Sequence, residues 1–304
     1  MLLTYELQRQ IKNVVKGEVR FNEPMRDRTT IKIGGPADVW FEPIDIEDIV
    51  AVTKFASENE IDITVFGGGS NILVRDKGVR GLVMSLAKFN EIKVSENSES
   101  IITAGAGVKL QQLLEFTLEK KLTGLECVTG IPGTVGGAVT MNAGTTDESV
   151  GLVVSNVKWV NKGKIYDVGK EKLDFSYRKL KAPKSVVIVE ATFALETAER
   201  ESIEAKINKI RKHRRDTQPL QWPSLGSVFK NPDKKEKAWE LIDGCRLRGV
   251  RVGGARVSNE HANWIINEGN ATAHDVEVLI RTIKEKVKEE SDILLEPEIT
   301  MIGE

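Results

Sequence analysis

Four short glycine-rich segments, separated by β-strand patterns, place the strongest constraint on how this chain can fold. Glycine lets a backbone approach a ligand closely, and successive free N–H groups can hold an anion. A single segment of this kind is most often a turn between strands. Four of them in less than half of the chain favour one long phosphate-bearing ligand. They are IGG at 33–35, FGGGSN at 66–71, AGAGV at 104–108 and IPGTVGGAVTMNAG at 131–144.

The common nucleotide-binding motifs do not explain these segments. FGGGSN stands between two strand patterns, whereas the Rossmann fingerprint requires G-x-G-x-x-G followed by a helix. The chain also lacks G-x-x-x-x-G-K-S/T, which excludes an ATPase P-loop. AGAGV leads from a strand into a helix whose N-terminus could face a phosphate, although this signal alone is weak. The sequence therefore predicts a dinucleotide lying across strand-to-strand loops of a non-Rossmann domain.

Helix and strand patterns mix without a regular βαβ order, which predicts an α+β architecture. Thr272, with Asp275 three residues on, resembles a capping box at the start of a helix. Apolar periodicity predicts the other helices over 5–16, 46–59, 108–121, 199–216 and 237–242. Short β-branched runs predict strands over 63–66, 72–74, 81–85, 92–94, 100–104, 153–160, 164–168, 185–194, 263–267 and 293–302.

Charge and composition exclude several classes of protein. The 44 Lys and Arg balance 45 Asp and Glu, so no general basic surface for nucleic acid exists. No apolar run approaches the roughly 20 residues of a membrane span, and the charged N-terminal segment lacks a signal peptide's apolar core. Cys127 and Cys245 form no C-x-x-C pair, and the three histidines are scattered. We expect a cytoplasmic protein with no metal site, no nucleic acid partner and no membrane.

The composition changes near residue 198. A strongly charged helix begins there, and Pro219 and Pro223 break the pattern that follows it. At about 150 residues per domain, a chain of 304 residues suggests two domains, and we place their boundary at this point.

Beyond these patterns, the sequence resembles the UDP-N-acetylenolpyruvoylglucosamine reductase family, flavin enzymes that complete UDP-N-acetylmuramate for bacterial peptidoglycan. The resemblance covers nearly the whole chain, and many ordered matches make it specific. The matching segments are TTIKIGGPAD (29–38), FGGGSNILV (66–74), GAGV (105–108), GLECVTGIPGTVGGAVTMNAG (124–144), SYR (176–178), GSVFKNP (226–232), GGARVSNEHANWIINEGNATAHDV (253–276) and LLEPEITMIG (294–303).

The resemblance implies a particular α+β fold. It is a two-lobed FAD-binding domain of the vanillyl-alcohol-oxidase type, followed by a smaller α+β substrate-binding domain. We expect the FAD domain over 1–198, with lobes at about 1–65 and 66–198, and the substrate domain over 199–291. The strand at 292–304 would return to the first lobe. No extra insert covers the substrate, which indicates the shorter subgroup of the family, and we expect a monomer.

The resemblance also implies the reaction. NADPH gives a hydride to non-covalent FAD, and reduced FAD gives one to the methylene carbon of the enolpyruvyl ether; the preference for NADPH rests on the resemblance alone. Ser227 is implied as the proton donor, Arg178 as the partner of the substrate carboxylate, and Glu296 as a nearby polarising group. Without the resemblance, composition favours a plain Gly-Ser turn for Ser227, and Arg178 and Glu296 could be a common surface arginine and strand-edge glutamate. Glu298 would point the same way as Glu296 in a regular strand, and only the family match selects Glu296.

Further residues follow from the same motifs. Tyr177, Lys230 and Asn231 are expected to bind the UDP-sugar, and the basic helix end at 209–218 also suits an anionic substrate. The expected FAD contacts are Gly67, Gly68, Gly69, Ser70, Asn71, Pro132, Gly133, Thr134, Gly136, Gly137 and Ala138.

Two departures from the family pattern fall in the expected substrate domain. Leu225 stands where a small residue is usual, and Arg246 stands where a glycine is expected. They concern the geometry of the substrate loops rather than the reaction. Two alternatives remain open: a flavin oxidase or dehydrogenase acting on another sugar or alcohol, and a binding protein without turnover.

Overall fold

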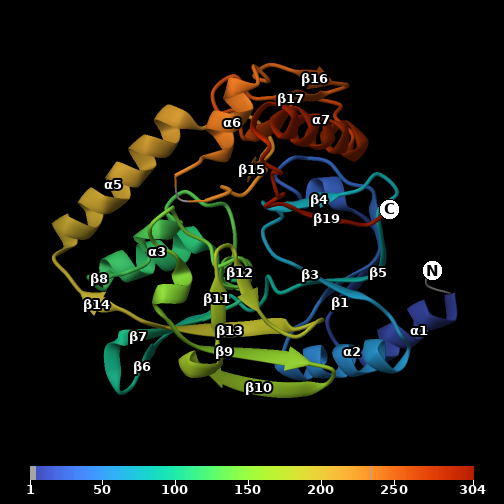
Figure 1. Ribbon diagram of the computed structural model, residues 1–304. Coiled ribbons are helices and arrows are strands. Elements are labelled where there is room, and N and C mark those ends of the chain that lie inside the picture. Colours follow the sequence, from blue (N-terminus) through green and yellow to red (C-terminus); the bar gives the residue numbers. More distant parts are fainter. Residues whose placement is uncertain (1–4, 234) are drawn as a thin grey trace. The chain divides into compact units, whose positions relative to one another are not determined.

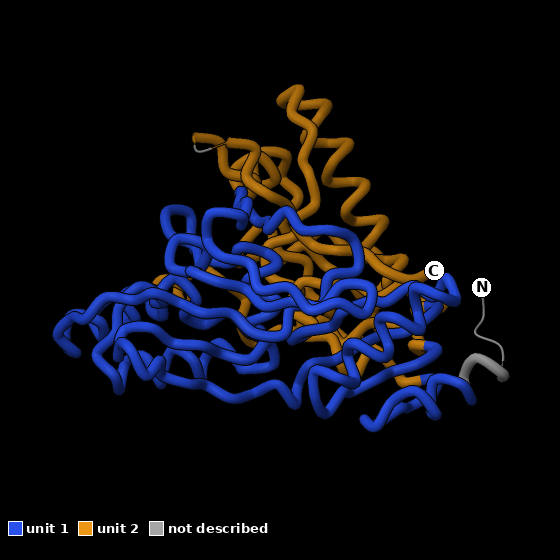
Figure 2. Tube along the Cα trace, turned by 90° about the horizontal axis from the view of Figure 1, so that it is seen from below, with its two compact units in different colours: residues 1–22, 38–68, 80–212 blue, residues 23–37, 69–79, 213–304 orange. Residues whose placement is uncertain are grey.

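The computed structural model describes residues 5–233 and 235–304. The chain forms two compact units, each assembled from separate stretches of sequence (Figure 2). Unit 1 contains residues 1–22, 38–68 and 80–212, and unit 2 contains residues 23–37, 69–79 and 213–304. Both units combine helices and sheets, so the α+β class is confirmed. The continuous domains expected over 1–198 and 199–291 stay a prediction.

A five-stranded antiparallel sheet forms the centre of unit 1, in the order β10-β9-β13-β7-β6 (Figure 1). Val157 of β9 pairs with Ala191 of β13 and Val168 of β10, and all three side chains are buried. The β-branched content of these strands suits a buried pleated surface. The strands are β6 (Ile92–Ser95), β7 (Ser98–Gly105), β9 (Val154–Asn161), β10 (Lys164–Gly169) and β13 (Val187–Ala194).

A second sheet has the order β1-β2-β5-β3, and most of its residues belong to unit 1. Its strands are β1 (Glu18–Pro24), β2 (Pro36–Glu42), β3 (Ile63–Phe66) and β5 (Val79–Ser85), with β3 and β5 parallel. Two small pairs complete the strands of unit 1. They are β11 (Asp174–Ser176) with β12 (Lys179–Lys181), and β8 (Leu122–Thr123) with β14 (Glu196–Thr197).

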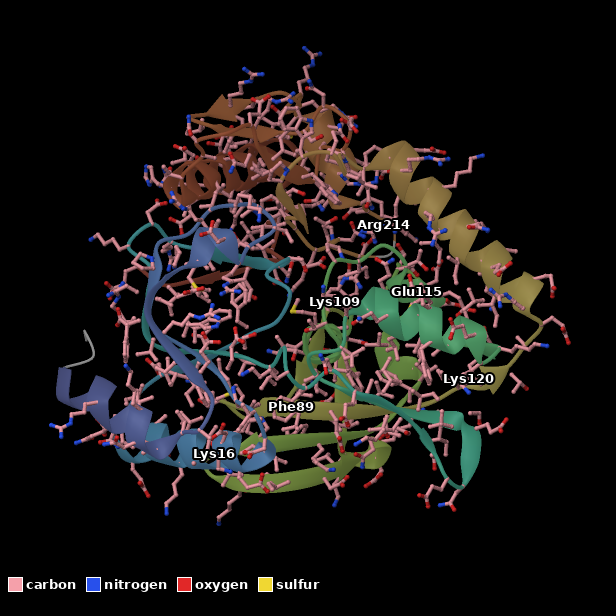
Figure 3. The ribbon with its side chains drawn as sticks, turned by 180° about the vertical axis from the view of Figure 1, so that it is seen from behind. Lys16, Phe89, Lys109, Glu115, Lys120 and Arg214 are labelled. Atoms are coloured by element: carbon pink, nitrogen blue, oxygen red, sulfur yellow. The ribbon has the colours of Figure 1, made fainter. Side chains whose placement is uncertain are left out.

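Helix α2 shows how the sequence defines the helices of unit 1. Asp45 caps it by accepting a hydrogen bond from the Asp48 N–H at 2.8 Å, and Ile49 and Val52 are buried. Lys16, labelled in Figure 3, pairs with the Asp45 carboxylate at 2.9 Å. The helices are α1 (Tyr5–Val14), α2 (Ile46–Glu58), α3 (Leu110–Glu119), α4 (Val135–Thr140) and α5 (Arg200–Thr217), whose last turn belongs to unit 2. Short 3-10 turns are η1 (Met25–Asp27), η2 (Glu126–Val128), η3 (Val150–Leu152) and η4 (Lys170–Lys172).

Unit 2 is built around a four-stranded sheet in the order β15-β18-β17-β16. The long helix α7 buries Leu279, Ile283 and Val287 against the core of this unit. A parallel pair joins β4 to the C-terminal β19. The elements are β4 (Ile72–Val74), β15 (Ser224–Ser227), β16 (Arg251–Val252), β17 (Ala255–Val257), β18 (Trp264–Asn267), β19 (Thr300–Ile302), α6 (Ala238–Gly244) and α7 (Ala273–Ser291).

The structure adds one helix that was not expected and shortens one expected strand. The glycine-rich stretch contains the short helix α4, which low helix propensity hid. The strand expected over 293–302 is reduced to Thr300–Ile302. Pro297 has no N–H to donate to a continuous ladder, so the chain before β19 makes only an isolated bridge to Phe229.

Candidate active site

Three of the four glycine-rich segments meet within unit 1. The loop after β3 lies against the loop before α4, and Gly67 and Gly68 have no room for side chains at the contact. A Cβ added to Gly67 would lie 2.9 Å from Thr134 Oγ1, and one added to Gly68 would lie 2.9 Å from Gly133 Cα. Both loop glycines are exposed on their other side, so the backbone there is open to a ligand.

The loop before α4 is fixed by the segment that contains AGAGV. The Val135 N–H donates to Val108 O at 2.9 Å, and the Gly136 N–H donates to Ala106 O at 2.9 Å. The Leu110 N–H, the first of α3, donates to Gly133 O at 3.0 Å. Lys109, labelled in Figure 3, precedes this helix. The start of α3 therefore holds the cradle in place, and its first N–H is not available to a phosphate.

The remaining expected FAD contacts divide by exposure. Pro132 is exposed, whereas Ala138 is buried and donates its N–H to Thr134 O at 2.8 Å. A Cβ on Gly137 would meet only Thr134 Oγ1 at 3.7 Å among its neighbours, so this glycine faces open space. The exposed backbone at Gly67 and Gly68, with the half-buried Gly137 next to Gly67, fits an extended diphosphate-bearing cofactor such as FAD.

The same glycine loop continues into unit 2 at Gly69, Ser70 and Asn71. Gly69 has a φ of 66°, the left-handed region that favours glycine, and its carbonyl accepts the Thr30 N–H at 3.0 Å. The Asn71 side chain donates to Glu298 O at 3.1 Å, and its carbonyl accepts the Thr300 N–H at 2.9 Å. The amide of Asn71 is therefore tied to the C-terminal segment.

Tyr177 and Arg178 form the two-residue turn of the β11–β12 hairpin in unit 1. Ser176 pairs with Lys179, so Tyr177 and Arg178 are the two residues of the turn between them. Arg178 has a φ of 56°, in the left-handed region that a glycine adopts more easily. Its guanidinium lies 5.2 Å from the centre of the Tyr177 ring. Tyr177 itself is exposed.

Cys127, in the GLECVTG segment, lies within the electrostatic influence of Arg178. Burial raises the pKa of the Cys127 thiol to about 12, and the charges of Glu148 and Glu126 act in the same direction. Arg178 acts in the opposite direction, so its guanidinium lies within electrostatic reach of the thiol. Cys127 is therefore a buried, protonated core residue.

The segments that contain Ser227 and Glu296 pair in unit 2 through the main chain. Ser227 is the last residue of β15 and pairs with Trp264 of β18. The residues after it form main-chain hydrogen bonds to two segments, one at Asn263 and one at 296–298. The Val228 N–H donates to Asn263 O at 2.8 Å, while Val228 O accepts the Glu298 N–H at 2.7 Å. The Lys230 N–H donates to Glu296 O at 2.9 Å. Segments 227–230 and 296–298 are thus held side by side.

The side chains of this pair of segments form one ion pair. Lys230 Nζ lies 3.3 Å from Glu296 Oε2, and the Glu296 side chain is 74% exposed. Such an exposed pair contributes little to stability, so both groups remain available to a ligand. Asn231 has a structural task, because its Oδ1 accepts the Ala238 N–H of α6 at 3.0 Å.

Asn263 is a residue that the motif analysis did not single out. Its Oδ1 accepts the Phe229 N–H at 2.9 Å, and its Nδ2 donates to Phe229 O at 2.8 Å. One side-chain amide therefore replaces a strand neighbour beside Ser227. The signal in the sequence was a polar residue within the apolar run ANWII, where burial requires hydrogen bonds.

The two departures from the family pattern have local explanations. Leu225 is 3% exposed and belongs to the apolar core of unit 2. Arg246 follows α6 with a φ of 58°, the conformation that a glycine would adopt more easily. Its N–H donates to Asp243 O at 2.8 Å, so a normal turn forms.

The basic end of α5 contains a partly buried cation, Arg214, which Figure 3 labels. Burial lowers the pKa of its guanidinium. Within the described residues, neither Arg214 Nε nor Gln218 Oε1, one turn further on, has a hydrogen-bond partner. Buried polar atoms of this kind usually face a ligand or ordered water.

A cavity of about 710 Å³ lies elsewhere in unit 2 and contains none of the expected catalytic residues. Asp76 on its wall accepts the N–H groups of Ala273 and His274 at 2.8 and 3.0 Å, which satisfies the start of α7. The described residues also contain no cluster of three potential metal ligands and no helix long and apolar enough to cross a membrane.

The glycine cradle of unit 1 fits FAD, and the class of protein is an FAD-dependent oxidoreductase. A sequence model described as an FAD binding domain matches residues 37–162. Another, described as the C-terminal domain of UDP-N-acetylenolpyruvoylglucosamine reductase, matches residues 218–302.

Full-length relatives give the same assignment. UDP-N-acetylenolpyruvoylglucosamine reductase of Geobacter metallireducens is 41% identical over 98% of this chain and 99% of its own. That of Clostridium novyi is 38% identical over 100% and 99%. The crystal structure of the enzyme from Thermus caldophilus matches with a TM-score of 0.81 at 32% identity, covering 95% of this chain and 99% of the other. This chain belongs to the UDP-N-acetylenolpyruvoylglucosamine reductase family.

Proposed function

We propose that this chain reduces UDP-N-acetylglucosamine enolpyruvate to UDP-N-acetylmuramate with NADPH as the hydride donor, and that Arg178, Ser227 and Glu296 are its catalytic residues. The observation that carries the proposal is the pairing of segments 227–230 and 296–298, which holds the family motifs that contain Ser227 and Glu296 side by side, with Lys230 opposite Glu296. The product places the protein in peptidoglycan precursor synthesis, and hence in cell shape and division. We also propose that it works in the cytoplasm as a monomer, without nucleic acid or membrane partners.

FAD, when bound, carries the hydride from NADPH to the methylene carbon of the substrate. Gly67, Gly68 and Gly137 would approach FAD through their backbone atoms. A Cβ at Gly67 or Gly68 would collide with the loop before α4. Residues 69–71 extend this loop in unit 2. The other expected FAD contacts stay part of the proposal. Ala138 is buried, so it supports α4 from inside and does not touch the cofactor.

Hydride addition leaves negative charge on the enolpyruvyl group, next to the substrate carboxylate. The Arg178 guanidinium can hold that carboxylate through two parallel hydrogen bonds and stabilise the developing charge. The tight turn holds the backbone of Arg178 in place before the substrate binds, which lowers the entropic cost of orientation.

Ser227 Oγ donates the proton to the carbon beside the carboxylate. A serine hydroxyl is a weak acid, so the site must stabilise or reprotonate the oxygen that remains. Gly226, with a φ of 76° and nothing near its missing Cβ, lets the chain turn just before Ser227. Lys230 and Glu296 form the neighbouring charged pair that can polarise the site.

The UDP part of the substrate requires cations and stacking or hydrogen-bonding groups. Tyr177 is exposed beside Arg178, and Lys230 stands beside Glu296. Arg214 Nε adds a donor that needs a partner, which suits the basic end of α5 to an anionic substrate. Asn231 contributes through its Nδ2 or indirectly through α6, since its Oδ1 is already used.

Anaerobic absorbance of the bound flavin tests the function. Addition of NADPH should bleach the flavin, and addition of UDP-N-acetylglucosamine enolpyruvate should restore the oxidised spectrum. Bleaching without recovery would contradict the proposed substrate and favour another flavin-dependent reaction. A protein that cannot be reconstituted with FAD would contradict the flavoenzyme assignment.

Substitution Ser227→Ala tests the proton donor. We expect reduction by NADPH to stay within about twofold, and the substrate-dependent recovery to slow by about 10²- to 10⁴-fold, the range of general acid catalysis. Ser224→Ala, on the same strand, is the matched control and should behave like the parent protein. Unchanged recovery in Ser227→Ala would remove Ser227 as the acid.

A further inference from the structure

Asn142 connects three segments of unit 1. It lies two residues beyond the end of α4, with a φ of 43° and 7% exposure. Its Nδ2 donates to Ser176 O at 2.9 Å, and its Oδ1 accepts the Gly151 N–H at 3.0 Å. Both ends of the side-chain amide are therefore used, one on the β11–β12 hairpin and one on η3.

The hairpin end of this connection is the root of the turn that carries Arg178. Ser176 is the last residue of β11, and its pairing with Lys179 closes the turn. Figure 1 shows the hairpin beside the five-stranded sheet, and α4 contacts both β12 and η3. A shift of the Ser176 carbonyl would move the two turn residues directly.

The backbone of Asn142 leads to the cofactor cradle. The Asn142 N–H donates to Val139 O at 3.2 Å, and the preceding Met141 N–H donates to Gly137 O at 3.0 Å. The backbone of Asn142 is thus continuous with the helix that carries Gly136 and Gly137. The path runs from the cradle through one rigid turn of backbone to Asn142, then through its amide to Ser176.

The packing around this amide leaves little freedom. A Cβ added to Gly151 would lie 2.7 Å from both Asn142 Oδ1 and Phe175 Cγ. The glycine, the amide and the hairpin therefore interlock, and another side chain at position 142 cannot reproduce the two bonds from the same place.

We infer that Asn142 is a positioning residue, which sets the place of Arg178 relative to the flavin loop. The inference rests on the proposed role of Arg178 in binding the substrate carboxylate. Asn142 holds the residue pair that closes the turn, because its Nδ2 donates to Ser176 O and Ser176 pairs with Lys179. A purely structural Asn142 would affect folding and both half-reactions alike, whereas a positioning residue affects the step that uses Arg178.

The test is a double-mutant cycle on the FAD-loaded protein, with Asn142→Ala, Arg178→Ala and the double variant. Each half-reaction is measured separately by anaerobic stopped flow. We expect Asn142→Ala to slow flavin reoxidation by the substrate about 10- to 100-fold, the effect of misplacing a catalytic group by about 1 Å. Flavin reduction by NADPH should change less than twofold. In the Arg178→Ala background, Asn142→Ala should slow reoxidation less than about twofold further, because the group it positions is gone.

Three further variants separate positioning from stability. Asn142→Asp keeps an acceptor for Gly151 but loses the donor to Ser176, so it should share the defect of Asn142→Ala. Gly151→Ala adds a Cβ that would collide with the Asn142 amide, so it should also slow reoxidation. This variant replaces Asn142→Ala in the test if Asn142→Ala does not fold. Val157→Ala, in the buried centre of β9, should lower the melting temperature without slowing reoxidation.

The outcomes are distinct. If Asn142→Ala slows reoxidation by the same factor with and without Arg178, or slows both half-reactions equally, the positioning role is overturned. If Arg178→Ala leaves reoxidation unchanged, the proposed role of Arg178 fails instead.

Discussion

Single polar side chains replace backbone partners at the points where this chain leaves regular structure. Asn263 holds the N–H and the C=O of Phe229, and Asn142 does the same for two different segments. A buried amide can serve a donor and an acceptor at once, and losing it leaves both partners unsatisfied. Such residues are hard to single out from sequence, because an asparagine in a loop is usually only a turn former.

His261 is a third residue of this kind, and it makes stability depend on pH. Burial first, and then the charges of Arg248 and His213, lower the pKa of its imidazole from 6.5 to about 4. Its Nδ1 accepts the Asn263 N–H at 3.3 Å, which requires the neutral form. The unfolded chain takes up a proton below about pH 6.5. The stability contributed by neutral His261 is therefore complete above that pH and is lost as the pH falls from 6.5 to 4.

The size of this effect can be measured by urea unfolding at pH 7 and pH 4.5. A shift of this size corresponds to at most about 3 kcal/mol in the free energy of unfolding. His261→Phe keeps a ring between Trp239 and Trp264, whose ring centres lie 6.3 and 6.2 Å away, but cannot titrate. The variant should lose less stability than the parent protein over this pH range. An equal loss in both would contradict a neutral, buried His261.

At the scale of elements, sequence patterns predicted those helices and strands whose burial follows a simple period. The apolar faces of α2, α3 and α7 were visible, and so was the capping box at Thr272. The glycine-rich α4 and the β11–β12 hairpin were not, because tertiary packing rather than propensity stabilises them. The strand expected over 293–302 was wrong where Pro297 interrupts the ladder.

Helix α7 allows its capping to be tested. Thr272 Oγ1 accepts the Asp275 N–H at 3.1 Å, and the Asp275 carboxylate accepts the Thr272 N–H at 2.9 Å. Thr272→Ala removes the first bond and should lower the free energy of unfolding by about 1 kcal/mol. Asp76 still holds two N–H groups of the first turn, so the loss should not exceed this figure much.

Denaturant unfolding of Thr272→Ala beside Glu285→Ala measures the cap. Glu285 is exposed in the middle of the same helix, so its removal should change stability by no more than about 0.5 kcal/mol. Similar losses in the two variants would show that the capping box contributes nothing specific.

At the scale of the whole molecule, the candidate site is assembled from segments far apart in the sequence. Glycine spacing predicted one long phosphate-bearing ligand, and family resemblance identified it as FAD. Neither indicated which glycines touch one another, because that depends on the register of the loop after β3 against the loop before α4. The same register decides that Ala138 points into the core although its neighbour Gly137 faces open space.

FAD binding should therefore stabilise the folded protein. The contact between the loop after β3 and the loop before α4 should determine how much the free energy of unfolding rises. A ligand that binds only the folded state, at 100 times its dissociation constant, raises the free energy of unfolding by about 2.7 kcal/mol. A Cβ at Gly68 would lie 2.9 Å from the backbone of Gly133, so Gly68→Ala must push the two loops apart. We expect this variant to bind FAD at least about tenfold more weakly, a loss of about 1.4 kcal/mol.

Thermal unfolding of FAD-free protein, titrated with FAD, measures this directly. Gly244→Ala is the matched control, because a Cβ there meets nothing within 4 Å. It should respond to FAD as the parent protein does, whereas Gly68→Ala should require about tenfold more FAD for the same increase in melting temperature. An unchanged response in Gly68→Ala would mean that FAD does not depend on the contact between these two loops. The cradle would then have to be sought elsewhere in the chain.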